Sequence, residues 1–143
     1  MAVRGRERRV TGIGGVFFKA EDPKALVRWY RRHLGIHIDG TVAVFAWRAG
    51  KDPRRKGHTV WSIFPSGSEY LGEGEARFMI NYRVKDLDGL LATLRREGVR
   101  VDPKLEDTRY GRFGWITDPE GNRIELWEPP KAYRAPEDEN PME

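Results

Sequence analysis

Along this chain a stretch of apolar positions typical of a β-strand is followed by apolar positions at helical spacing, and this succession occurs twice. The segments "GGVFFKAEDPKALVRWYRRHLGIHID" and "FMINYRVKDLDGLLATLRREGVRVD" each begin with a β-like stretch and pass through an acidic turn into a helical pattern. Both end with a glycine before a short β-prone stretch. Asp22 aligns with Asp86, and Gly35 with Gly98 after one extra residue. Such self-similarity predicts two copies of one supersecondary unit.

Each copy contains one amphipathic helix with recognisable ends. Asp22 and Asp86 are suited to N-caps, and Pro23 is suited to a first helical position. Gly35 and Gly98 suit the left-handed residue after a helix. The apolar stripes are Leu26, Trp29, Tyr30 and Leu34 in the first copy, and Leu87, Leu90, Leu91 and Leu94 in the second. Stripes at helical spacing belong to a core, so we assign them no chemistry.

Further β-like segments follow each helix. They are "TVAVFAWR" and "HTVWSIFP" in the first copy, and "RYGRFGWIT" and "RIELWE" around a "DPEGN" turn in the second. The order β-α-β-β-β therefore occurs twice, which indicates an α+β fold. We divide the chain into a basic flexible arm (1–10), a first module (11–64), a connector (65–76), a second module (77–130) and a flexible tail (131–143).

Composition narrows the function classes. The chain has 143 residues, 38% hydrophobic content, no cysteine and no apolar run that approaches a membrane span, so we expect a cytoplasmic protein without disulfides or a membrane partner. The net charge is +4, and the dense basic run is "VRGRERR" at residues 3–9. No nucleic-acid-binding motif accompanies it. We interpret it as a solvated arm, and a nucleic-acid accessory protein remains the weakest alternative.

Strand alternation places one acid on an aromatic face. In "RIELWE", Ile124 and Leu126 point one way, and Glu125 and Trp127 point the other. If "DPEGN" is the turn, Trp115 pairs near Glu125. By the same pairing, another aromatic ring at position 113 lies opposite position 127. Apolar walls with a few polar anchors are typical of a small-molecule pocket.

Other residues are assigned to this face by parity and by the repeat. Met79, Asn81 and Arg83 alternate on the strand that opens the second copy, and Gly15, Phe17 and Lys19 are their counterparts in the first. Trp47 and Trp61 are further candidates for the walls, and Lys19, Arg83 and Arg112 would suit an anionic or carbonyl-bearing ligand. Tyr110 lies in "TRYGR", which we predict to form a loop at the rim of the cup. The predicted ligand-binding residues are Phe17, Asn81, Arg83, Tyr110, Arg112, Phe113, Trp115 and Trp127.

These motifs make the chain resemble the vicinal oxygen chelate superfamily, which includes glyoxalase I, extradiol dioxygenases and the fosfomycin and bleomycin resistance proteins. The resemblance covers roughly residues 11–130 and is carried by "FFKAEDPKALVRWYRRHLGI", "NYRVKDLDGLLATLRREGV" and, most specifically, "GWITDPEGNRIELWEP". It implies two tandem βαβββ modules whose mixed sheets form a cup, with the active site inside. It also implies a homodimer.

The resemblance further implies a set of metal positions. Metal-dependent members commonly place one ligand on the first strand of each module and one on a later strand. By register these positions are Gly15, Ser62, Met79 and Glu125. Only the glutamate is an ordinary ligand for a divalent ion, and a catalytic site needs about three protein ligands. We therefore predict no metal cofactor, and keep a divalent metal on Glu125 and His58 as an alternative.

Three interpretations of Glu125 stay open. It can bind a polar substrate or a cation, form a structural ion pair with Arg83 or Arg112, or act as a catalytic general base whose pKa burial has raised. His33, His37 and the third histidine are expected at the surface or at helix ends. We predict a protein that binds a small organic molecule in the cup without metal. The alternative is a metal-dependent lyase or dioxygenase that uses Glu125 with atypical ligands such as His58 or Asn81.

Overall fold

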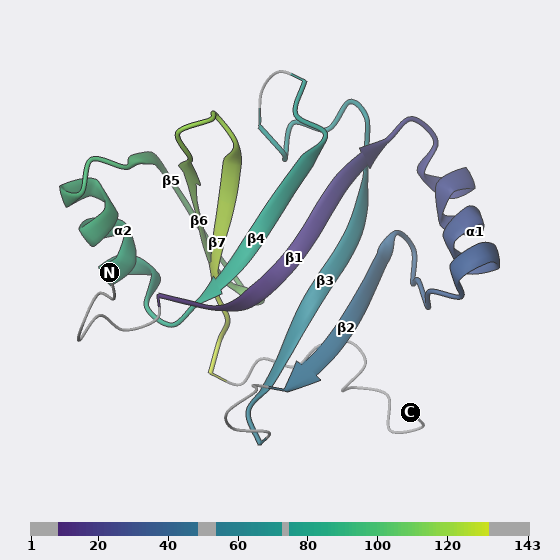
Figure 1. Cartoon of the computed structure of the whole chain (residues 1–143), viewed down its shortest axis with the longest axis horizontal. Coiled ribbons are helices and arrows are strands. Elements are labelled where there is room, and N and C mark those ends of the chain that lie inside the picture. The colour runs from purple at the N-terminus through teal and green to yellow at the C-terminus, as the bar shows by residue number, and fades with distance from the viewer. Residues whose placement is uncertain (1–8, 49–53, 73–74, 132–143) are drawn as a thin grey trace.

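The computed structural model describes residues 9–48, 54–72 and 75–131, which form a seven-stranded mixed sheet and two helices (Figure 1). The elements are β1 (Val10–Ala20), α1 (Pro23–Leu34), β2 (Val42–Arg48), β3 (Lys56–Pro65), β4 (Phe78–Val84), α2 (Leu87–Arg96), β5 (Arg100–Thr108), β6 (Gly111–Thr117) and β7 (Arg123–Glu128). The predicted α+β fold of two tandem modules is confirmed. Most of the predicted arm and tail, residues 1–8 and 132–143, lies outside the described residues.

The two modules join through their opening strands. The strand order is β2-β3-β1-β4-β7-β6-β5, so β1 and β4 pair antiparallel in the middle of the sheet. Within each module the opening strand pairs parallel with the last strand, β1 with β3 and β4 with β7. The hairpin of β6 and β7 has the predicted register, with Trp115 opposite Glu125 and Phe113 opposite Trp127.

The first module has one strand fewer than expected. Ile36 and Ile38 follow α1 and pack into its core instead of joining the sheet. The chain then turns at Gly40, whose φ is 64°, and Asp39 and Val42 form only an isolated bridge. The corresponding stretch of the second copy forms the nine-residue strand β5. The short β-prone segment was therefore predicted correctly in one copy only.

Both helices begin and end as their sequences predict. The carboxylate of Asp22 accepts a hydrogen bond from the backbone N–H of Ala25, and Asp86 accepts one from Gly89, each at 3.1 Å. Gly35 ends α1 in the left-handed conformation with φ 65°. Such caps satisfy backbone groups that would otherwise lack partners at the helix ends.

The stripe of α1 differs from the prediction. Trp29 is 49% exposed and Leu34 is 61% exposed, while Val27 is buried in their place. In α2 the prediction holds, because Leu87 and Leu91 are buried against the sheet. Of the predicted stripe of α1, Leu26 and Tyr30 therefore pack against the core, and the other two residues do not.

The sheet has two different faces. Both helices pack on one of them, which we call the helix face, and Figure 1 shows them at its two ends. The opposite face, which we call the inner face, carries a separate core of Phe17, Met79 and Trp115 from the sheet. Trp61 packs against Tyr30 of α1, with ring centroids 5.1 Å apart, so it does not line the inner face.

Trp47 also lies on the helix face. It has the parity of Ala43, which belongs to the core under α1, and its indole N–H donates to the hydroxyl of Thr59 at 2.9 Å. The prediction that Trp47 and Trp61 wall the cup is therefore wrong. Alternation alone could not decide which face of the first module is covered by its helix.

Gly111 offers a test of how the end of the inner face is built. Its φ is +124°, and a Cβ there would lie 2.4 Å from the carbonyl oxygen of Glu128 and 2.8 Å from Nε1 of Trp127. We expect Gly111→Ala to lower the free energy of unfolding by about 3 kcal/mol, because strain and overpacking add. Gly67→Ala is the control, since a Cβ at Gly67 meets nothing within 4 Å. Urea denaturation measures both, and equal stability of the two variants would contradict this account.

Candidate functional site

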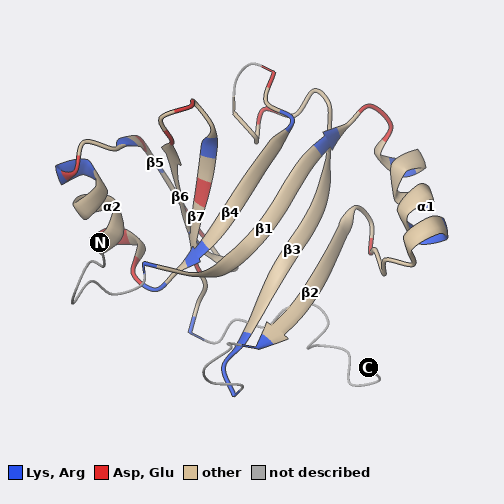
Figure 2. Cartoon of the chain, in the orientation of Figure 1, with Lys and Arg blue, Asp and Glu red and all other residues tan. Residues whose placement is uncertain are grey.

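One row of paired residues crosses the inner face. Val60 of β3, Gly15 of β1, Asn81 of β4, Glu125 of β7 and Trp115 of β6 are successive partners. Paired side chains of neighbouring strands point to the same face, at strand spacings of about 4.8 Å. Figure 2 shows the acidic segment in the middle of β7, away from the strand ends where most charges of the sheet lie. Register therefore puts Glu125 between an amide and an indole.

Glu125 is 0% exposed and accepts three hydrogen bonds. The Tyr70 hydroxyl and the Trp115 indole N–H donate to its Oε2 at 2.5 and 2.9 Å. The side-chain amide of Asn81 donates to its Oε1 at 2.6 Å. All three donors are uncharged, so the site is a carboxylate held by dipoles and not by a cation. Buried charges need such bonds, because desolvation otherwise costs several kcal/mol.

The pKa values agree with this division of roles. Burial raises the pKa of Glu125 above its ordinary 4.5, and the hydrogen bonds from Tyr70, Asn81 and Trp115 act in the opposite direction. Burial also raises the pKa of the Tyr70 hydroxyl far above its ordinary 10, and the charge of Glu125 adds to this rise. The phenol therefore stays protonated and donates a hydrogen bond to the carboxylate.

The connector between the modules fills the inner face. The ring of Tyr70 lies 6.3 Å from that of Phe17 and 6.4 Å from that of Trp115, measured between centroids. Their strands, β1 and β6, are three strand spacings apart, about 14 Å in a flat sheet. Leu71 is 0% exposed in the same cluster. Two consecutive connector residues thus bridge both halves of the sheet.

Sequence reasoning missed Tyr70 and Leu71. It treated residues 65–76 as a connector, because glycine, serine and glutamate dominate the stretch and no period is visible. The available signal was the adjacent pair of large apolar side chains in an otherwise polar segment. Such a pair predicts an anchor point, but not its partner.

Buried polar groups gather on the inner face. Within the described residues the buried polar or charged side chains are His58, Ser62, Asn81 and Glu125. On β3, His58 and Ser62 alternate with residues of the helix face and share parity with Val60, which packs on the inner core. The expectation of a surface histidine at position 58 is therefore wrong.

The positions implied for a metal do not fit one. A Cβ at Gly15 would lie 2.7 Å from the ring of Phe17, so that ring fills the space of a first ligand. Met79 is buried among apolar side chains, and its thioether is a poor ligand for hard divalent ions. In the described ranges no three His, Cys, Asp or Glu side chains lie close enough to hold a metal ion. Glu125 is the single hard ligand, and neutral donors already surround it.

The aromatic end of the inner face is well ordered. Phe113 and Trp127 stack with centroids 6.2 Å apart and planes 9° apart. The indole N–H of Trp127 donates to the carbonyl oxygen of Tyr110 at 2.8 Å. Tyr110 itself is 53% exposed at the turn between β5 and β6, where the predicted rim loop lies.

The predicted cationic residues are not brought together. Arg112 points to the helix face and pairs with Asp88 of α2 and with Asp107. Arg112 and Phe113 are neighbours in β6, so their side chains point to opposite faces of the sheet. The predictions that Arg112 lines the cup and that it pairs with Glu125 are therefore wrong. Arg83 remains on the inner-face parity of β4, one residue pair beyond Asn81. The bonds of Glu125 come from other groups.

Two cations that were not predicted lie over Trp115. Arg123 is 5.1 Å and Lys104 is 5.5 Å from the ring centroid. Arg123 also pairs with Asp102, at 3.2 Å. Cation–π contacts of this kind act on the face of the indole, whereas its hydrogen bond to Glu125 is made at the ring edge.

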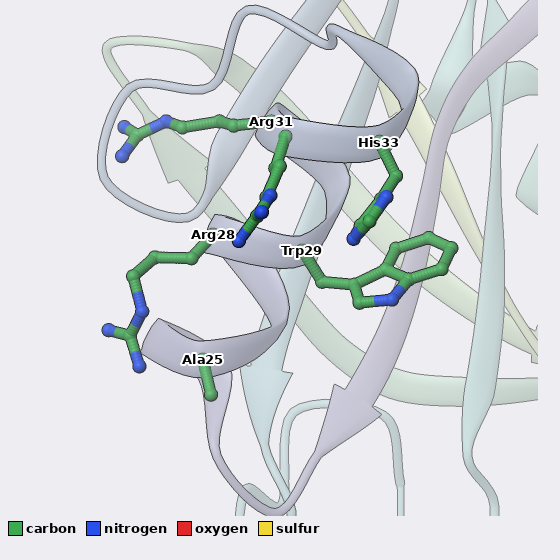
Figure 3. Close-up of a pocket in the computed structure, with 6 residues that line it drawn as sticks. Ala25, Arg28, Trp29, Arg31 and His33 are labelled. Carbon is green, nitrogen blue, oxygen red and sulfur yellow. The ribbon is translucent and has the colours of Figure 1, made fainter.

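Two open hollows lie away from Glu125. One, of about 540 Å³, runs along α1, and Figure 3 shows Arg28, Trp29 and His33 projecting from this single helix around it. The other, of about 570 Å³, lies where several strands end. Neither is lined by Glu125 or by its donors. Glu125 and Trp115 are 0% and 1% exposed, so neighbouring side chains cover them on the inner face.

Substitutions at Glu125 test the polar network. Glu125→Ala leaves three donors without a partner and should lower the free energy of unfolding by about 3 kcal/mol. Glu125→Gln should cost less than about 1 kcal/mol, because the Asn81 amide can rotate and accept from the new amide. The Oδ1 atom of Asn81 has no partner among the described residues.

The raised pKa of Glu125 also predicts how the stability of the protein changes with pH. A raised carboxyl pKa means that the folded state holds the proton more tightly than the unfolded chain. The wild type should therefore lose stability relative to Glu125→Gln as the pH rises from 4.5 through the folded-state pKa. Urea denaturation below and well above that pH measures the difference. A difference that is constant, or that grows in the opposite direction, would contradict the assignment.

Comparison with known proteins gives a family. The model of the Glyoxalase/Bleomycin resistance protein/Dioxygenase superfamily matches residues 12–126. Curated protein sequences give no match.

Solved structures give the same fold. Methylmalonyl-CoA epimerase from Streptomyces coelicolor, in complex with 2-nitronate-propionyl-CoA, is 20% identical with a TM-score of 0.62, over 84% of this chain and 98% of that chain. The epimerase from Mycobacterium tuberculosis is 22% identical with a TM-score of 0.54, over 90% and 96%. A structure described as NAD-dependent benzaldehyde dehydrogenase from Legionella pneumophila is 15% identical with a TM-score of 0.53, over 81% and 98%. At these identities the likeness shows the fold alone.

Proposed function

This chain belongs to the Glyoxalase/Bleomycin resistance protein/Dioxygenase superfamily, and from that premise we propose that it binds a small organic molecule on its inner face without a metal. One observation carries the proposal. A buried carboxylate is held by Tyr70, Asn81 and Trp115, in a face that also holds the other buried polar groups. A packed core alone has no use for such groups, whereas a binding site does.

The site chemistry favours a ligand with a hydrogen-bond donor and an apolar or aromatic body. Glu125 supplies the acceptor, and Phe17, Phe113, Trp115 and Trp127 supply the walls. In the proposed complex the ligand donor replaces the Tyr70 hydroxyl at Oε2 of Glu125. A second donor of the ligand meets Oδ1 of Asn81, the buried acceptor without a described partner.

Binding needs a change in the connector. Tyr70 and Leu71 fill the space above Glu125, so the ligand displaces these two side chains. Their removal exposes apolar surface, which the ligand body then covers. The closed arrangement is the resting state in this proposal.

The metal-dependent alternative has less support. Phe17 fills the space at Gly15, and the other implied positions are Ser62 and Met79, so Glu125 would hold an ion nearly alone. A general base without metal stays compatible with the raised pKa of Glu125, provided that Tyr70 leaves its Oε2. The epimerase activity of the structural neighbours is theirs, and no observation on this chain assigns it the same substrate.

Indole N–H signals in NMR spectra offer a site-specific test. Trp115 and Trp127 lie on the inner face, whereas Trp29 and Trp61 belong to α1 and the helix face. We expect a hit from a fragment library of amines, phenols and amides to shift the first pair and leave the second unchanged.

A cavity variant sharpens the same test. Leu71→Ala should bind fragments at least about tenfold more tightly, because the space over Glu125 is then open. Leu91→Ala is the control, since Leu91 is equally buried but lies under α2. The proposal would be overturned if no fragment moved the Trp115 signal in either the wild type or Leu71→Ala. It would also be overturned if Leu71→Ala and Leu91→Ala gained fragment affinity equally.

The expected homodimer and cytoplasmic location stay predictions. Ile13, Phe78 and Ile80 are 43%, 67% and 37% exposed on the helix face between the two helices. A second copy packed there would cover them, which light scattering of the purified chain would test. None of the helices in the described ranges is long and apolar enough to cross a membrane.

A further inference from the structure

A second feature lies beyond the row of Glu125, where several strands of the sheet end. The hollow of about 570 Å³ forms where β1 and β3 begin and where β2, β4 and β7 end. We call it the basic groove. Its charged and aromatic lining residues are Trp47, Arg55, Lys56, Lys85, Glu128 and Lys131, together with Arg83. Figure 2 shows basic segments at the lower ends of β2, β3 and β4.

The groove has a strong excess of positive charge. Arg55, Lys56, Lys85 and Lys131 form no ion pair with a residue that the structure describes. The acid of the groove, Glu128, accepts a hydrogen bond from the backbone N–H of Leu87 at 2.8 Å, so its charge is directed to the start of α2. Like charges around a low-dielectric hollow raise the local potential by several kT and concentrate anions.

The floor of the groove is an indole that the backbone makes room for. A Cβ at Gly57 would lie 2.2 Å from the ring of Trp47, and a Cβ at Gly12 would lie 2.5 Å from it. Two glycines on different strands therefore let this ring lie flat against the sheet. Its N–H is held by Thr59 at 2.9 Å, which fixes the ring orientation. A fixed, half-buried indole face is suited to stacking.

We propose that the basic groove binds an organic phosphate that carries a planar ring, such as a nucleotide, with the ring on Trp47 and the phosphates among Arg55, Lys56, Lys85 and Lys131. The cations come from three separate segments of the chain and converge on one hollow. In contrast, the arginines of the hollow along α1 all project from one helix. Convergence around a prepared aromatic floor distinguishes a site from a solvated surface.

The site is independent of the proposed function on the inner face. Trp47 lies on the helix face, whereas Glu125 and its donors lie on the inner face. Occupation of the groove should therefore shift the indole signal of Trp47 and leave that of Trp115 unchanged. If no ligand shifts one of these two indole signals, only the proposal for that site is contradicted. The two proposals are therefore tested separately.

The experiment titrates ADP into the full-length chain at about 150 mM salt, where weak surface attraction is screened. We expect saturable binding that shifts the Trp47 indole signal. The double substitution Lys56→Glu with Lys85→Glu should weaken binding about tenfold or more. Its control is Lys24→Glu with Arg100→Glu, two exposed cations outside the groove, which changes the net charge equally and should change the affinity less than about twofold.

A second experiment tests the proposed contact between the ligand ring and Trp47. Wild-type chain should bind ADP about tenfold more tightly than pyrophosphate, and Trp47→Leu should remove this preference. Calorimetry measures both ligands. If Trp47→Leu does not fold, the lysine pair and the Trp47 signal still decide the question.

Several results would overturn the proposal. They are no shift of the Trp47 signal, equal weakening in the two double variants, or equal affinity for ADP and pyrophosphate in the wild type. A short single-stranded oligonucleotide that binds more tightly than ADP, with steep salt dependence, would reassign the groove to nucleic acid.

Discussion

The burial of one carboxylate is the constraint on which the inner face depends. An ionised glutamate without bonds is costly in a dry interior, so the fold must bring donors to Glu125. Two of them follow from strand register, because Asn81 and Trp115 are its neighbours on β4 and β6. The third, Tyr70, comes from the connector. Hydrogen bonding to Glu125 therefore ties the connector to the second module. The ring of Tyr70 also contacts Phe17 of the first module.

In the proposed function, the same arrangement lets the superfamily fold bind a ligand without the metal positions that the resemblance implies. A metal supplies positive charge to bind and polarise a ligand, whereas here neutral donors around Glu125 leave a hydrogen-bond acceptor in an aromatic setting. Phe17 closes over Gly15 and removes the space of one metal ligand. One fold thus supports different chemistry through a few substitutions on one face, which is why the fold alone does not assign the function.

The sequence predicts the elements whose patterns are local. Caps at Asp22 and Asp86 set the helices, and the "DPEGN" turn sets the register that pairs Trp115 with Glu125. The same parity, applied strictly, puts Arg112 on the helix face, so that error was avoidable. The position of Trp61 was not predictable, because a period of two gives alternate faces without saying which one a helix covers.

Long-range contacts are where prediction from the sequence fails. Tyr70 reaches Glu125 across 55 positions of the chain, and its segment has no periodicity that indicates burial. The lost strand of the first module also depends on tertiary packing. Ile38 is buried in the core under α1 outside the sheet, whereas the equivalent Val101 packs against the core under α2 while it pairs with Ile116 in the sheet. The basic groove is similar, because its cations are scattered in sequence and meet only where the strands end.

The central claim is that the inner face works around Glu125 without a bound metal. Elemental analysis tests it most directly, on untagged protein purified without chelator and then offered manganese, iron, cobalt, nickel and zinc, beside the Glu125→Ala variant. The account predicts far less than one metal per chain, and the same trace amount in the variant. Near-stoichiometric metal in the wild type that is lost in Glu125→Ala would contradict it.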